Sequence, residues 1–232
     1  MEIFERTICI GGKPTPLLIR RNKNARRVIL RVSEKHNGLI VTLPPLGTLD
    51  DVRDIVTKQE KWVQSRLAQV LVHIPFEAGV EIPIFGVSHK ICHFPNDYGG
   101  VWRASGKLCV TGRTEHVARR IRDWFRREAK VQIRPIAEAK ARILRSNIGR
   151  VTIKDTRTRW GSCSAKGNLN FSWRILLMPK KVFEYIIIHE VAHLREQNHG
   201  KEFWKLVQFM HPNFDHSRLW LKKYGEKLHR IG

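Results

Sequence analysis

Cysteine is scarce in this sequence, and the cysteines form no short motif. The chain of 232 residues contains four, Cys9, Cys92, Cys109 and Cys163, with no Cys-x-x-Cys pair among them. This spacing excludes a zinc-ribbon ligand set, and it is typical of reduced thiols in a reducing compartment.

Long apolar runs are also missing. The first residues, MEIFERTICIGG, contain Glu2, Glu5 and Arg6 where a signal peptide needs an uninterrupted apolar core, and no later run approaches a membrane-spanning length. We therefore expect a cytoplasmic protein without membrane association. The sequence also contains no internal repeat, no low-complexity segment and no glycine-rich phosphate loop of the Walker type.

Acidic residues are few relative to basic ones. Asp and Glu number 21 against 43 Lys and Arg, which gives a formal net charge of +22. Such an excess favours a polyanionic partner, such as nucleic acid, nucleotide phosphates or an anionic membrane surface, although a basic soluble protein without such a partner is an equal alternative. The hydrophobic content of 42% is that of an ordinary globular chain, long enough for one large domain or two modest ones.

The first part of the chain is predicted to be a β-rich N-terminal domain, residues 1–112. Strands are expected at 26–32 and 39–44, joined in a hairpin by the turn residues 36–38, and further strands at 80–86, 87–94, 101–105 and 107–112. Between these groups the apolar spacing from Leu49 to Val72 indicates a helix that ends before Pro75.

The second part, residues 113–232, is predicted to be mainly helical around a small sheet. A long helical segment begins at Thr114 and is expected to kink or break at Pro135. A hairpin of 151–164 and 169–177 follows, then a helix after Pro179 and two tail helices divided near 211–213. The predicted fold class is therefore α+β.

The segment HEVAHLREQNHG, residues 189–200, contains the strongest chemical signal. Residues four apart lie on one face of a helix, so His189 and His193 can bind one metal ion together. Glu190 lies about 100° around the helix from His189, beside the ion rather than among its ligands. A catalytic zinc needs three protein ligands and one open position, and His199 is the candidate for the third. The alternative is a helix end that is merely rich in histidine.

Three histidines with an adjacent glutamate predict hydrolysis. One Zn²⁺ per chain would supply Lewis acidity, and Glu190 is placed to accept a proton from the attacking water and to pass it to a leaving amine. Peptide hydrolysis is the natural reaction of such a site.

Four stretches of the sequence resemble the YgjP-like metallopeptidase family, which is related to the SprT and WLM zinc peptidases. They are RRNKNARRVILRV (20–32), RWGSCSAKGNLNFSWRILLMP (159–179), YIIIHEVAHLREQNHGKEFW (185–204) and PNFDHSRLWLKKYG (212–225). The resemblance implies a zincin-like second domain with a backing helix, a small sheet, an active-site helix and C-terminal helices. It also implies zinc on His189, His193 and His199, with Glu190 as the catalytic residue.

The resemblance further implies a peptide or protein substrate that pairs with the hairpin 151–177 as an added strand. Candidate substrate-binding residues are Arg159, Trp160, Gly161, Ser162 and Arg218. Core packing is the alternative role for Trp160 and Trp173. The sequence offers several donors for a developing negative charge, namely His211, His216, Arg218 and Tyr224, without choosing among them.

Two other functions remain open at this stage. The basic charge, with arginines near the expected cleft, suits a metal-dependent hydrolase of nucleotide phosphoanhydrides, such as a nucleoside triphosphate pyrophosphatase. The missing Walker loop weakens that alternative. The basic run at 20–27 would suit a DNA-associated protease, although a run of charge is usually a solvated face. The sequence indicates no oligomeric state.

Overall fold

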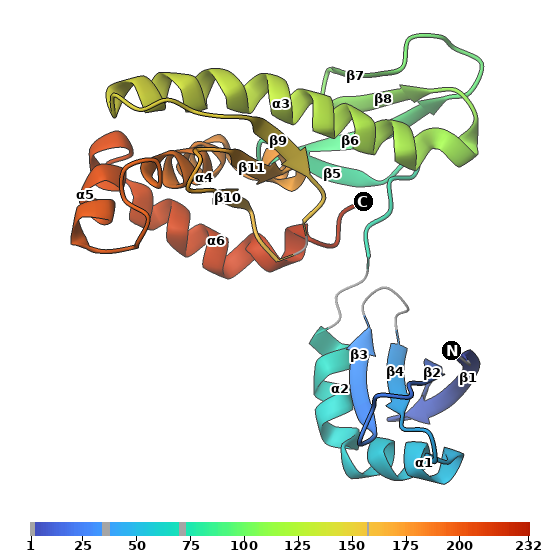
Figure 1. Ribbon diagram of the computed structural model, residues 1–232. Coiled ribbons are helices and arrows are strands. Elements are labelled where there is room, and N and C mark those ends of the chain that lie inside the picture. The colour runs from blue at the N-terminus through green and yellow to red at the C-terminus, as the bar shows by residue number, and fades with distance from the viewer. Residues whose placement is uncertain (1–2, 34–37, 70–72, 157) are drawn as a thin grey trace. The chain divides into compact units, whose positions relative to one another are not determined.

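The computed structural model describes residues 3–33, 38–69, 73–156 and 158–232 (Figure 1). The chain divides into two compact units, Met1–His73 and Ile74–Gly232. The predicted turn residues His36 and Asn37, the predicted helix end at 70–72, and Arg157 lie outside the described residues. Within the described ranges, no helix combines the length and the apolar character needed to cross a membrane.

The first unit is a four-stranded sheet with two helices. The sheet order is β1 (Ile3–Ile10), β2 (Lys13–Arg21), β4 (Gly38–Leu43), β3 (Ile29–Ser33), and only the β2–β4 pair is parallel. The predicted hairpin of 26–32 and 39–44 is confirmed by the antiparallel β3–β4 pair. Buried side chains of the helices, including Val52, Val56 and Val63, share one core with the sheet.

The predicted single helix of 49–72 consists of two helices. These are α1 (Leu49–Lys58) and α2 (Glu60–Gln69), separated at Gln59, whose φ of −112° and ψ of 17° are not helical. Helix α1 begins at a capping box, in which Thr48 and Asp51 bond to each other's backbone N–H groups.

The second unit begins with another four-stranded sheet, ordered β5 (Glu81–Ile84), β6 (Val87–Phe94), β8 (Lys107–Thr111), β7 (Val101–Ala104). All four strands fall where the sequence predicts them. They pack against α3 (Val117–Ile143), and their buried residues Ile82, Ile91 and Leu108 belong to the core of the second unit. The predicted division after residue 112 therefore falls inside this unit, because the β5–β8 sheet has no separate core of its own.

The two four-stranded sheets repeat one topology, although no repeat is evident from the sequence. In each, two antiparallel hairpins are joined by one parallel pair, β2–β4 in the first sheet and β6–β8 in the second. The inner strands read LIVT at 39–42 and LCVT at 108–111, and both Leu and Val side chains are buried. Short strands of this kind carry too little pattern for the repeat to be detected from sequence alone.

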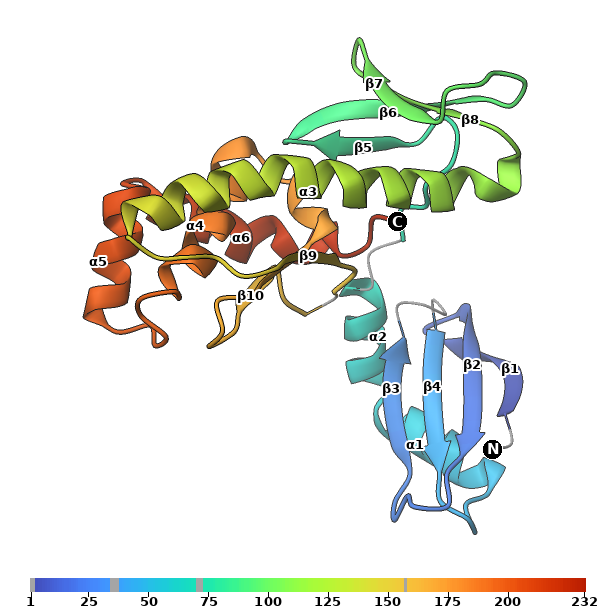
Figure 2. The same ribbon diagram turned by 45° about the horizontal axis from the view of Figure 1, so that its top comes forward.

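Helix α3 continues through Pro135, so no break occurs there. Pro135 is exposed, while Ile133 and Ala137 on the opposite face are fully buried. A proline on the solvent side removes one backbone hydrogen bond, but packing on the buried face holds the helix together. Figure 2 shows α3 running across the unit, with the β5–β8 sheet on one side of it and helices α4 to α6 on the other. The β5–β6 turn nevertheless contacts α4, where the ring centroids of Phe85 and Phe183 are 5.3 Å apart.

The predicted hairpin of 151–177 has three strands and a short helix. The order is β10 (Gly161–Cys163), β11 (Leu169–Ser172), β9 (Val151–Lys154), with β10–β11 antiparallel and β11–β9 parallel. Residues 173–177, predicted as strand, form a 3-10 helix, η2 (Trp173–Leu177), in which all five residues are buried and whose first turn is capped by the Ser172 hydroxyl accepting from the Arg174 N–H. The edge of β10 that does not pair with β11 has no strand partner among the described residues.

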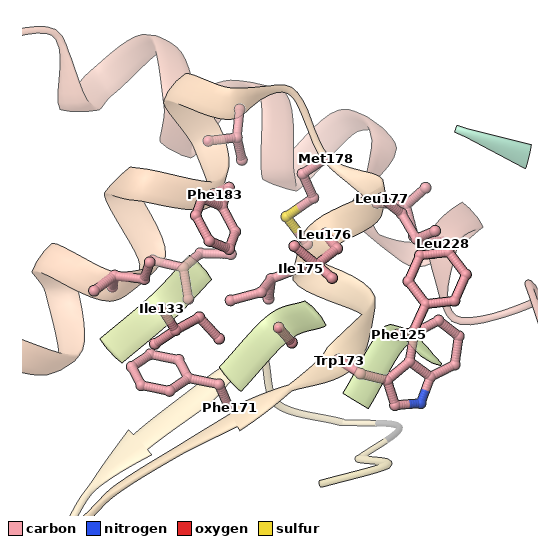
Figure 3. Packing of buried hydrophobic residues seen from close by; sticks show 14 of the residues in the cluster. Phe125, Ile133, Phe171, Trp173, Ile175, Leu176, Leu177, Met178, Phe183 and Leu228 are labelled. Carbon is pink, nitrogen blue, oxygen red and sulfur yellow. The ribbon is translucent and has the colours of Figure 1, made fainter. Parts of the chain in front are cut away.

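Three helices complete the second unit. They are α4 (Lys180–Ala192), which follows Pro179 as predicted, α5 (Lys201–Met210) and α6 (Phe214–Leu228), divided at 211–213 as predicted. Aromatic and aliphatic side chains from α3, β11, η2 and α4 fill the core between these elements (Figure 3). Phe125 and Trp173 lie at one end of that core, with ring centroids 5.1 Å apart. This packing anchors α4, whose last turn supports the site.

Candidate metal centre

The three predicted histidine ligands come together where α4 ends and α5 begins. His189 lies in the last turn of α4, and His193 is the C-cap residue of that helix. His199 lies just before Gly200, the N-cap residue of α5. One potential ligand atom from each histidine lies within 4.8 Å of the others. The helix period brings the first pair together, and the turn between the helices adds the third.

The distances within this group suit one small cation. The Nε2 atoms of His189 and His199 are 3.0 Å apart. Two imidazoles on a tetrahedral zinc, at Zn–N distances of about 2.0–2.1 Å, would hold their nitrogens about 3.3 Å apart. His193 Nδ1 lies 2.9 Å from the carbonyl oxygen of Glu196. Since a carbonyl oxygen only accepts, Nδ1 carries the proton, and Nε2 is left with a free lone pair.

His189 and His199 are held in their neutral form. Burial lowers the pKa of His189 to about 3, and the neighbouring His193 and His199 add to this effect. Burial and His193 also lower the pKa of His199. Neutral imidazole is the form that binds a metal, so this donor set fits a divalent ion.

Aromatic side chains from α5 fix the ring positions. The Phe203 ring is fully buried and lies 4.6–5.0 Å, centroid to centroid, from all three imidazole rings. Trp204 Nε1 donates a hydrogen bond of 3.1 Å to the carbonyl oxygen of His199. The packing of Phe203 and the hydrogen bond from Trp204 therefore together fix the position of the loop that carries His199.

Glu190 is a buried carboxyl group beside the histidines. Its residue is 7% exposed, and burial raises the pKa of its carboxyl to about 7. A carboxyl with this pKa can take up and release a proton near neutral pH, as a general base requires. Glycine at position 161 makes room for it, because a Cβ built there would lie 2.6 Å from Glu190 Cγ.

An open cleft of about 260 Å³ gives access to this group. Its lining includes His189 and Glu190 together with three predicted substrate-binding residues, Arg159, Trp160 and Gly161. Ser162, also predicted, does not line this cleft and instead lines a neighbouring polar pocket. Gly161 borders both the cleft and this pocket, whereas Ser162 borders only the pocket, since successive residues of a strand point to opposite faces.

Arg218 of α6 lies near the histidine group. Its guanidinium carbon is 4.6 Å from the Trp204 ring centroid, a cation–π arrangement. Its positive charge adds to the lowering of the pKa values of His189 and His199. The electric field of the Arg218 guanidinium therefore reaches the histidine group.

None of the four predicted donors, Arg218 included, is among the residues that line the cleft. His211 Nε2 lies 3.2 Å from the Ser217 hydroxyl. Tyr224 packs against Trp220, with ring centroids 5.3 Å apart, and His216 is exposed on α6. The sequence alone gives no reason to choose between these residues and Arg218, because all four lie in or beside one helix.

The cleft also contains three residues that the sequence interpretation missed. Tyr185, Ile186 and Leu221 line it. Tyr185 could have been found, because it precedes His189 by four residues and shares its helix face; its hydroxyl lies 3.5 Å from His189 Nδ1. Leu221 could not, since its approach depends on how α6 packs against α4.

The remaining candidates near the site are structural. Trp173 is fully buried in the core, as the core-packing alternative predicts. Cys163 is partly buried, and burial followed by the negative charge of Glu190 raises the pKa of its thiol to about 11. The thiol is therefore protonated at neutral pH and is a poor metal ligand.

Comparisons with known proteins identify a family, one curated relative and one solved structure. The family described as "YgjP-like, metallopeptidase domain" matches residues 26–224. The UTP pyrophosphatase of Escherichia coli (strain K12) is 28% identical over 105 residues, which cover 44% of this chain and 62% of that relative. The protein in the crystal structure of the metallopeptidase zymogen of Pyrococcus abyssi abylysin is 24% identical in sequence to this chain. The match covers 39% of this chain and 93% of that one, with a TM-score of 0.35. Because the family match extends over most of the sequence, this chain belongs to the YgjP-like metallopeptidase family.

Proposed function

We propose that this protein is a zinc-dependent peptidase with a zincin-like catalytic domain. Family membership supports a metal-dependent hydrolase. The observation that carries the finer proposal is the group of three histidines, within reach of one metal ion, with a buried glutamate beside it. This combination matches the ligand number and the general base of a hydrolytic zinc site.

His189, His193 and His199 would hold one zinc ion, which would supply Lewis acidity toward the scissile carbonyl and lower the pKa of a water at the site. Glu190 accepts the proton of the attacking water and transfers it to the leaving amine. Gly161 allows the carboxyl to reach this position, and burial keeps its pKa near 7.

The free edge of β10 supports binding of an extended peptide. Gly161 in β10 lies against Glu190, so a strand added along this edge would pass beside the base. Main-chain hydrogen bonds would hold such a peptide whatever its sequence, while pockets on either face would select alternate side chains.

Arg218 is proposed to stabilise the negative charge that develops on the substrate oxygen. The cation lies beside Trp204 and acts on two of the histidines. A fixed cation near a developing oxyanion stabilises the transition state more than the ground state. Loss of this group should therefore lower kcat more than it raises KM.

The test compares three proteins, the wild type, Glu190→Gln and His193→Ala. Metal analysis should find about one zinc per chain in the wild type and in Glu190→Gln, and none in His193→Ala. Peptide libraries should be cleaved by the wild type only, with at least a 100-fold loss in Glu190→Gln. A wild-type protein without bound metal would exclude the proposal.

A nucleoside triphosphate pyrophosphatase is the second candidate. It is favoured by the 28% identity to the Escherichia coli UTP pyrophosphatase and by the net charge of +22. The same three proteins distinguish the two functions. Glu190-dependent release of pyrophosphate from UTP, with peptide libraries left intact, would replace the peptidase proposal.

A further inference from the structure

A polar pocket of about 280 Å³ lies beside the catalytic cleft, over one face of the small sheet. Strand register places Lys154, Ser162 and Asn170 on this face, because Ser162 pairs with Asn170 and Lys154 pairs with Ser172. Phe171 and Gly161 lie on the opposite face by register, and Phe171 belongs to the core, although both residues also border the pocket. The polar side chains Lys154, Ser162 and Asn170 therefore define one side of the pocket.

The pocket combines two positive charges with several hydroxyl groups. Lys154 and Arg159 contribute the charges, and Thr158 and Ser162 contribute hydroxyls, while the Thr156 hydroxyl donates to the carbonyl oxygen of Arg159 at 2.6 Å. Asn170 Nδ2 lies 3.4 Å from Ser162 Oγ, which orients both groups. Lysine, arginine, hydroxyl and amide side chains together are the donors that proteins use to bind carboxylate or phosphate oxygens.

No acidic side chain neutralises these charges. The pocket lining contains no Asp or Glu, and in the described part of the chain neither Lys154 nor Arg159 forms an ion pair. The nearest acid in sequence, Asp155, is bonded to the buried Arg174 instead. The two cations are thus left available for an anionic ligand.

The pocket and the catalytic cleft share Arg159 and Gly161. The Cβ direction of Gly161 faces Glu190, and the next residue, Ser162, faces the pocket. A peptide added along β10 would alternate in the same way. Every second side chain would point toward the catalytic cleft, and the intervening side chains would point toward the polar pocket.

We infer that this pocket selects peptide substrates with an acidic side chain. Asp or Glu of a bound peptide would place its carboxylate between Lys154 and Arg159, with the hydroxyls as further donors. The inference rests on the proposed peptidase function and adds a preference to it. The preference for an acidic side chain should appear at one peptide position, or at two positions that are two residues apart. It should not appear at the position between them.

The test measures kcat/KM of the zinc-loaded full chain on matched peptides that differ only by Glu or Gln at one position. We expect about a tenfold preference for Glu at the selected position, equivalent to about 1.4 kcal/mol. Lys154→Met should reduce this ratio to near one, and Lys154→Glu should invert it, so that the Gln peptide is preferred over the Glu peptide. Lys154 is used because it does not line the catalytic cleft.

Lys166→Met serves as the matched control. Lys166 is exposed in the turn between β10 and β11 and does not line the pocket, so its loss removes one nearby charge without changing the proposed contact. Its Glu-to-Gln ratio should equal that of the wild type. Thermal unfolding and zinc content of each variant verify that the fold is intact.

Binding of the same peptides to the Glu190→Gln variant is measured by the change in Trp fluorescence. This measurement does not depend on turnover. Tighter binding of the Glu peptide that disappears in the double variant Glu190→Gln, Lys154→Met supports the inference. Peptides cleaved at equal rates whatever their charge would overturn the inference and leave the peptidase proposal intact. If no peptide is cleaved or bound, the peptidase proposal itself fails, and the acidic preference with it.

Discussion

Gly161 and Glu190 are in direct contact, so closely that a Cβ on residue 161 would lie 2.6 Å from Glu190 Cγ and 2.7 Å from Glu190 Oε1. The edge strand β10 and the end of helix α4 thus meet at Glu190, the proposed base, although the two residues are 29 positions apart in the chain. The contact makes the position of the carboxyl dependent on the absence of a side chain at residue 161.

Gly161→Ala is therefore expected to displace the Glu190 carboxyl. A methyl group at this distance forces the helix side chain to shift, and displacement by about 1 Å can lower the rate about 100-fold. Steady-state kinetics on a cleaved peptide would measure the loss. Gly200→Ala is the control, since a Cβ at position 200 meets no atom within 4 Å. Equal activity of both variants would show that this contact does not matter.

The pH dependence of kcat/KM should show an acid limb. Burial raises the pKa of Glu190 to about 7, and a general base works only when deprotonated, so activity should fall as pH decreases below this value. A bound dication would shift the limb to lower pH, because it favours the carboxylate. The measurement is kcat/KM from pH 5 to 9. A flat profile over that range would contradict the role of Glu190 as base.

Metal removal should lower the thermal stability of the wild type. A ligand that binds only the folded chain stabilises it by about 2.7 kcal/mol when present at 100 times its Kd. We expect the Tm to fall by several degrees with a chelator and to recover with added zinc. His193→Ala should show no such response. A Tm independent of zinc in the wild type would argue against a metal at this site.

His229 should contribute to a loss of stability in mild acid. Burial, followed by the charge of Arg174, lowers its pKa to about 4, and its ring stacks on Trp160 with centroids 4.0 Å apart. In the unfolded chain a histidine has a pKa of about 6.5, so between about pH 6.5 and 4 the unfolded state takes up the proton first and stability falls as pH falls. His229→Gln removes this titration.

The corresponding measurement is the Tm at pH 7 and pH 5 for the wild type and His229→Gln. The decrease between the two pH values should be smaller in the variant. It should not vanish, because the pKa values of His189 and His211 are lowered as well. An identical decrease in both proteins would rule out a contribution from His229.

Most element positions could be predicted from local pattern. The strands of the second sheet, the start of α4 after Pro179 and the division of the tail near 211–213 follow from turn residues and apolar spacing. Of the predicted kink or break at Pro135, the break does not occur, because burial of the other helix face outweighs one lost hydrogen bond. The domain boundary at 73 and the parallel β11–β9 pair depend on contacts between distant residues, which local pattern does not contain.

For the site, the sequence predicts which residues lie together on the helix. The spacing of His189, Glu190 and His193 places two candidate ligands on one helix face and a carboxyl beside them, because the helix period is a property of the backbone. A zinc ion, a peptide substrate, nucleic-acid binding and a cytoplasmic location remain predictions from the same sequence. Only the tertiary structure decided what surrounds that chemistry, since the Gly161 contact, the cleft and the pocket at Lys154 arise where separate strands and helices pack together.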